Sequence, residues 1–159
     1  MSTNRQKSFL ATLSFHDKPV GMSLHRGNPV PVWSQKNTGE ADVIYFRCTD
    51  DWYTLYIRSE GDYFGKTIDS TGKFFTCGTQ SDIATFKIIN KEWKTLTLDD
   101  LKTNNENVYL LTRDGTRINA EFVFGDEPQR IIANGQINIS FDLTILERNT
   151  PYLSNPDEV

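Results

Sequence analysis

The part of the chain that indicates the fold most clearly runs from Tyr53-Thr54-Leu55-Tyr56-Ile57-Arg58 to Ala84-Thr85-Phe86-Lys87-Ile88-Ile89. Large apolar side chains alternate with other side chains in the first run, as they do in a half-buried strand. Between the two runs lie further apolar stretches at 63–68 and 73–77, separated by the tight-turn sequence Asp69-Ser70-Thr71-Gly72. Four short strands in 37 residues (53–89) leave no room for helices.

The same rhythm occurs three times along the chain, at 8–48, 53–89 and 107–146. Each stretch closes on an apolar run that contains one phenylalanine: Phe46, Phe86 or Phe141. The first two phenylalanines are 40 residues apart (86 − 46) and the last two are 55 apart (141 − 86). The difference of 15 is close to the length of 90–106, which we interpret as an insertion into a threefold pattern.

The insertion has a different composition from the strand-like stretches. Thr97 is followed by Leu98-Asp99-Asp100-Leu101-Lys102. A threonine at the N-cap with acidic residues in the first turn is typical of a helix start. The sequence therefore predicts a short helical insertion near 97–102.

The chain resembles the β-trefoil superfamily, and residues 53–89 carry the resemblance best. The opening Tyr63-Phe64-Gly65, the turn at Gly72, the return strand at Phe74-Phe75 and the closing strand at Phe86 are similar to one trefoil repeat. The resemblance implies an all-β fold and a single domain over 1–159. It implies a barrel of three four-stranded units, with six strands closing the barrel and six forming a hairpin cap.

The resemblance also implies a lectin-like binding function, although the Gln-x-Trp signature of ricin-type lectins is missing. None of the three tryptophans, Trp33, Trp52 and Trp93, has a glutamine two positions earlier. A calycin-like up-and-down barrel and a two-sheet sandwich stay open as alternative folds.

Composition narrows the classes of function. The chain has 159 residues, a net charge of −4 and 19 aromatic residues (10 Phe, 6 Tyr, 3 Trp), which suits one compact β domain. It has no block of five or more Lys or Arg residues, so we do not expect nucleic-acid binding. No apolar run approaches a membrane span, and 9–15 is too short and too alternating for a signal peptide. We expect a cytoplasmic or non-classically secreted protein, with Cys48 and Cys77 both reduced.

Catalytic and metal-binding signals are weak. The only histidines are His16 and His25, and no hydrolase elbow, phosphate-binding loop or zinc-protease motif occurs. The carboxylate pairs Asp50-Asp51, Asp99-Asp100 and Asp126-Glu127 lack the alternate spacing of a calcium loop, so we interpret them as turn or cap residues. We expect no enzymatic activity, no cofactor and no metal.

Two places combine tryptophan with polar neighbours. Sugars are bound by stacking their apolar face on an aromatic ring while carboxylates and amides hydrogen-bond their hydroxyl groups. The candidate ligand-binding residues with this composition are Asp51, Trp52 and Tyr53 at a predicted unit boundary, and Trp33, Gln35 and Asn37 at a predicted loop. Each tryptophan also has a plain interpretation as a core residue of a small barrel.

The sequence thus supports two main hypotheses. The first is a non-enzymatic carbohydrate-binding module whose partner is a carbohydrate or glycoprotein. The alternative is a protein-binding module, such as an inhibitor or a toxin-associated or cytoskeletal domain, that acts through the 34–42 loop or the 90–106 insertion. An enzyme with a catalytic group assembled from distant residues is the least favoured of the three.

Overall fold

A computed structural model describes residues 2–24, 29–78, 82–121 and 128–150, and its regular structure is almost entirely β-strand. Two 3-10 turns, η1 (Arg5–Lys7) and η2 (Leu98–Asp100), are the helical elements of this part of the chain. The strands are β1 (Phe9–Phe15), β2 (Lys18–Ser23), β3 (Val32–Gln35), β4 (Ile44–Thr49), β5 (Trp52–Ile57), β6 (Ile68–Thr71), β7 (Phe74–Cys77), β8 (Thr85–Ile89), β9 (Thr95–Leu96), β10 (Asn105–Thr112), β11 (Ile118–Ala120), β12 (Ile131–Ala133) and β13 (Phe141–Arg148).

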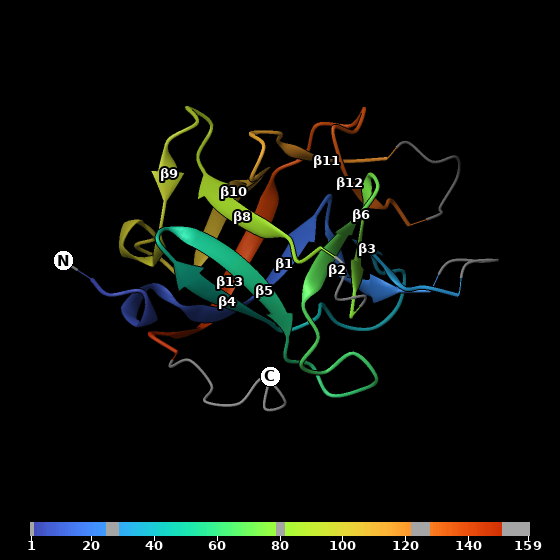
Figure 1. The fold of residues 1–159 in the computed structure, drawn as a ribbon, viewed down its shortest axis with the longest axis horizontal. Helices are drawn as coiled ribbons and strands as arrows, with labels where there is room; N and C mark the ends of the chain where they lie inside the picture. The colour runs from blue at the N-terminus through green and yellow to red at the C-terminus, as the bar shows by residue number, and fades with distance from the viewer. Residues whose placement is uncertain (1, 25–28, 79–81, 122–127, 151–159) are drawn as a thin grey trace.

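Six strands form a closed barrel (Figure 1). The antiparallel ladder runs from β1 through β13, β10, β8 and β5 to β4, and β4 pairs with β1 to close the ring. Closure satisfies both edges of every barrel strand. The closed ring excludes a two-sheet sandwich. The six barrel strands follow one another around the ring in chain order, but the pairs β2–β3, β6–β7 and β11–β12 come between them, so the fold is not a plain up-and-down barrel.

Three hairpins lie outside the barrel: β2–β3, β6–β7 and β11–β12. They contact one another through single pairs, Val32 with Thr76 and Ile132 with Phe74. A further bridge joins Ser34 to Arg130. The hairpins therefore form one connected layer, and β2 also pairs with β1 at the edge of the barrel.

The core is built from alternating side chains of the barrel strands and from aromatic rings. In β1 every second residue from Phe9 to Phe15 is buried, as the period of a half-buried strand predicts. Trp33 is only 1% exposed, and its ring packs against those of Phe75, Phe86 and Phe141. The hairpin layer and the barrel thus share a single core.

The expected short helix in the insertion is confirmed. Thr97 N donates to Asp100 Oδ2 at 2.9 Å, and Asp100 N donates to Thr97 O at 2.9 Å. These two hydrogen bonds define η2 as a single capped turn.

Two expected boundaries are wrong. The stretch 63–68, expected as a strand, is mostly loop, and the strand β6 begins only at Ile68 and includes the residues expected to turn. Gly61 and Gly65 have φ of 136° and 82°, which lie outside the strand region of backbone space. The loop expected at 34–42 begins late, because Ser34 and Gln35 belong to β3 and are buried.

Candidate functional site

A cleft of about 550 Å³ opens between the β6–β7 turn, the start of β8 and the turn that follows β10. Its walls come from the described residues of 70–85, from 112–114 and from Ala133, and the β8–β10 pairing brings the first two segments together. We call it the Arg113 cleft, and its lining residues are Ser70, Gly72, Phe75, Asp82, Ile83, Ala84, Thr85, Thr112, Arg113, Asp114 and Ala133.

Arg113 is held in place by contacts with two other strands. Its Nε donates to Thr85 Oγ1 at 3.0 Å, and its guanidinium carbon lies 4.5 Å from the centre of the Trp52 ring. Lys87 Nζ lies 4.7 Å from the same ring. An arginine stacked on an aromatic face keeps its remaining N–H groups available for a ligand.

Asp114 provides the matching acceptor. Its carboxylate accepts a short hydrogen bond from Thr112 Oγ1 and a second bond, of 3.3 Å, from Thr116 N. These bonds hold the pKa of Asp114 below its ordinary value. The turn closes through Gly115, whose φ of 87° favours glycine. Asp114 is therefore an ionised acceptor on a defined turn.

The floor of the cleft is apolar. Phe75 lies beneath it, with its ring centre 5.9 Å from that of Trp33 and 5.5 Å from that of Phe86. Ile83 is 50% exposed at the rim. A rigid apolar floor under a polar rim is the usual plan of a small-molecule site.

The cleft combines donors with acceptors. Arg113, Ser70 and Thr85 offer donors, and Asp82 and Asp114 offer carboxylate acceptors. Its described lining contains neither histidine nor cysteine, the commonest general base and the strongest nucleophile. This arrangement suits a ligand that has many hydroxyl groups and one apolar face.

The comparisons with known proteins do not add to this description. No protein-family model matches the chain, and no curated protein and no solved structure matches it. In the described ranges, no helix has the length and apolarity needed to cross a membrane. The same ranges contain no group of three or more His, Cys, Asp or Glu side chains arranged to hold a metal.

Trp33 and Gln35, two of the candidates from the predicted loop, are buried. Trp33 presents no ring face to solvent, because it is enclosed in the aromatic core. Gln35 is 3% exposed; its Nε2 donates to Phe15 O at 3.0 Å, and its Oε1 accepts from Gln129 N at 3.2 Å. Both side chains support the fold from within and do not face a surface ligand.

The third candidate from that loop, Asn37, is exposed. The exposed tip at 37–40 is held at its base by Lys36 and Asp42, whose Nζ and Oδ1 are 3.4 Å apart. Asp42 Oδ2 also accepts from Met22 N at 2.8 Å. Asn37 is not among the residues that line the Arg113 cleft.

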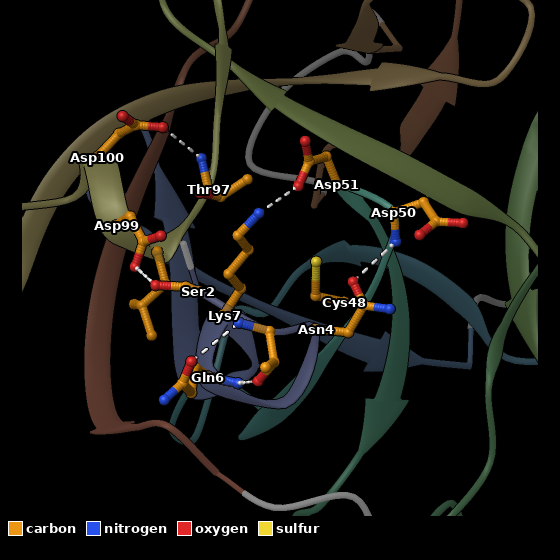
Figure 2. Close-up of polar contacts among 12 residues, drawn as sticks. Ser2, Asn4, Gln6, Lys7, Cys48, Asp50, Asp51, Thr97, Asp99 and Asp100 are labelled. Carbon is orange, nitrogen blue, oxygen red and sulfur yellow. Dashed lines mark hydrogen bonds and ion pairs between the residues drawn. The ribbon is translucent and has the colours of Figure 1, made fainter.

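Asp51 lies at the end of the barrel that η1 and η2 cover (Figure 2), and Tyr53 contacts residues of the same end. Asp51 Oδ1 accepts from Lys7 Nζ at 2.8 Å, and this bond raises the pKa of Lys7. The Tyr53 hydroxyl donates to Lys7 O at 2.8 Å and accepts from Leu98 N at 3.2 Å. These contacts join the N-terminal segment to the insertion.

Figure 2 shows further polar contacts at this barrel end. Ser2 Oγ donates to Asp99 Oδ1 at 2.9 Å, and Asp50 N donates to Asn4 Oδ1 at 3.1 Å. The carboxylate pairs 50–51 and 99–100 thus serve as turn and cap residues, as expected. Asp126-Glu127 and His25 lie outside the described residues.

None of the sequence candidates lines the cleft itself. Trp52 contacts its Arg113, and Trp33 packs against its Phe75 from the core. Arg113, Asp114 and Asp82 were not among the candidates. Asp114 and Gly115 were noted as a turn, and nothing in the sequence indicates that this turn faces the start of β8.

No disulfide joins Cys48 and Cys77, and both side chains are buried. Burial raises the pKa of the Cys77 thiol to about 11 and also raises the pKa of Cys48. Both are therefore protonated, unreactive thiols at neutral pH, in agreement with the expectation that they are reduced.

Proposed function

We propose that this protein is a non-enzymatic carbohydrate-binding module on a β-trefoil scaffold, with the Arg113 cleft as its binding site and a glycan or glycoprotein as its partner. The single observation that carries the proposal is the cleft itself, in which a stacked arginine and an ionised aspartate border an apolar floor. Aligned donors and acceptors over an apolar surface match the two faces of a sugar ring.

The scaffold proposal draws its support from the closing phenylalanines. Each pairs with the strand that begins its own predicted unit: Phe46 with Phe9, Phe86 with Tyr53, and Phe141 with Val108. Each of these units also contains one of the three outer hairpins. Threefold repetition of one pattern, with β9 and η2 as additions in the insertion, agrees with a trefoil.

The pKa of Asp114, one of the two carboxylates in the cleft, argues against its use as a catalytic acid. A glycosidase needs one carboxylic acid whose pKa is raised so that it can protonate the leaving group. The hydrogen bonds to Asp114 lower its pKa instead. Asp114 is therefore suited to accept hydrogen bonds from ligand hydroxyl groups.

A glycan array with matched variants tests the proposal. We expect the labelled protein to bind one family of glycans and Asp114→Asn to bind them about tenfold or more weakly, since a hydrogen bond to a charged group contributes about 1.5–3 kcal/mol. Asp62→Asn, an exposed aspartate outside the cleft lining, is the control and should bind normally. A blank array from folded protein, or full binding by Asp114→Asn, would refute the site.

One observation favours the alternative of a protein-binding module that acts through 90–106. Trp93 at the β8–β9 turn is 53% exposed, which is unusual for a tryptophan in a small barrel. If this segment binds a protein, Trp93→Ser abolishes partner capture while glycan binding by the Arg113 cleft is unchanged. The exposed tip of the 34–42 loop is the second surface for the same test.

A further inference from the structure

A second cleft, of about 310 Å³, lies at the start of β13. It is bordered by the β1–β2 turn, by β10 and by the segment that leads into β13. We call it the Arg117 cleft, and its lining residues are His16, Tyr109, Arg117, Asn138, Ile139, Ser140 and Asp142.

Each of the two clefts lies where the end of one barrel strand meets the start of the strand beside it. Thr112, which precedes Arg113, pairs with Phe86 at the start of β8. Phe15, which precedes His16, lies against Phe141 at the start of β13, with ring centres 5.7 Å apart. The two clefts therefore lie at corresponding strand ends, and different side chains line them.

Arg117 is the charged group of the second cleft. Its guanidinium carbon lies 4.1 Å from the centre of the Tyr109 ring and 5.8 Å from that of the Trp93 ring. Within the described part of the chain, no carboxylate lies within ion-pair distance of Arg117. Stacking on a ring fixes the plane of a guanidinium. Its edge, which carries parallel N–H donors, then stays available to bind a planar anion.

The rest of the cleft is polar but not uniformly cationic. Asp142 is exposed, and its Oδ1 accepts from Asn107 Nδ2 at 3.0 Å. Asn138, Ser140 and His16 add groups that donate or accept hydrogen bonds. The lining thus provides one guanidinium, that of Arg117, for an anion and several hydrogen-bonding partners for hydroxyl groups. Among these partners, the Asp142 carboxylate accepts hydrogen bonds.

We infer that the Arg117 cleft is a second, separate site that binds an acidic sugar unit, with the carboxylate of the sugar on Arg117 and its hydroxyl groups on Asp142, Asn138 and Ser140. This site is independent of the Arg113 cleft and does not need that cleft to bind any ligand. Its volume is at the lower end of the range of about 300–1,000 Å³ for small-molecule sites, which suits one terminal unit of a glycan.

Asp142 decides between a carboxylate and a phosphate. Its negative charge offsets that of Arg117 in the same small cleft, so the second negative charge of a phosphate gains little net attraction while it loses hydration. A carboxylate also matches the two-pronged edge of the guanidinium in plane and in charge. We therefore expect sugar carboxylates to bind better than sugar phosphates.

NMR titration of the ¹⁵N-labelled protein tests the inference with three probes at equal ionic strength: sodium glucuronate, glucose and glucose 6-phosphate. We expect glucuronate to shift the Arg117 Nε–H and Trp93 indole signals, and glucose to leave them unchanged. Arg117→Gln should weaken glucuronate binding about tenfold or more, the loss typical of a charge-assisted pair. Arg117→Lys keeps the charge without the fork and should bind with intermediate affinity.

Arg58→Gln is the matched control, because the Arg58 guanidinium also lies over an aromatic ring, 5.4 Å from the centre of Tyr45, and lines neither cleft. It should bind glucuronate like the unaltered protein. Glucuronate shifts no larger than those of glucose, equal binding by folded Arg117→Gln, or preferred binding of glucose 6-phosphate would each overturn the inference. A failure of the Arg113 cleft would appear separately, as a glycan array on which Asp114→Asn has no effect.

Discussion

The three tryptophans have similar polar neighbours in sequence and three different environments in the structure. Trp33 is enclosed in the core, Trp52 supports Arg113 from behind, and Trp93 is half exposed beside Arg117. Residue type alone does not separate these roles, because a strand presents alternate side chains to opposite faces and the register decides which face a tryptophan takes.

Replacing Trp33 tests its assignment to the core. Trp33→Ala should lower the free energy of unfolding by about 3–5 kcal/mol, because it removes a large ring from an enclosed aromatic cluster. Trp93→Ala, at an exposed position, should change stability by only about 0.5 kcal/mol. Urea unfolding followed by circular dichroism measures both, and equal effects of the two changes would contradict this assignment.

The candidate site was only partly predictable at the residue scale. Trp52 was predicted as a site residue because of its type and its position at a unit boundary, and it does contact the cleft arginine. Arg113 could not be predicted, because its role depends on Thr85 and Trp52, which the β8–β10 and β5–β8 pairings bring near it. The order of residue types along the chain does not show that these three residues meet, because their closeness depends on the register of the barrel strands.

At the scale of elements, the strands with clear alternation were predicted best. Residues 9–15 and 53–58 were expected as strands and form β1 and β5, because apolar side chains on every second residue suit only an extended chain with one buried face. The expected strand at 63–68 failed because its aromatic residues have high strand propensity, whereas the nearby glycines place the backbone in left-handed conformations. Propensity is overridden wherever the backbone must bend.

Tyr53 connects two elements, η1 and η2, and its hydroxyl group can be removed without disturbing its ring. Tyr53→Phe should lower the free energy of unfolding by about 1–3 kcal/mol, because Leu98 N loses its acceptor in a buried position. Amide exchange at Leu98 should become faster. Tyr56→Phe, which loses only a 3.5 Å contact with Arg47, should have little effect on either measurement.

At the scale of the whole molecule, the barrel holds several ionisable groups that must stay protonated. Burial raises the pKa of Cys77 to about 11 and also raises the pKa of Cys48 and of Tyr53. Below about pH 8.5, the ordinary value for a thiol, these groups keep their protons in both the folded and the unfolded states. Above that pH the unfolded chain loses protons that the folded barrel retains, so alkali favours unfolding.

We therefore expect the free energy of unfolding to be constant from neutral pH to about pH 8.5 and then to fall steadily as the pH rises toward about 11. Urea titrations at a series of pH values measure this dependence. Cys77→Ala should flatten the curve, because it removes the thiol whose pKa is about 11. An unchanged slope in Cys77→Ala would show that the Cys77 thiol does not contribute.

The pairing of β13 between β1 and β10 has a consequence for synthesis on the ribosome. Until β13 has left the exit tunnel, β1 and β10 each have an edge without a neighbour, and the nascent chain cannot close its ring. Open edges on apolar strands invite pairing with other chains, so the emerging protein depends on chaperones or on rapid completion. Ribosome stalling before Phe141 should thus yield an aggregation-prone chain, even though most of its strands have already been made.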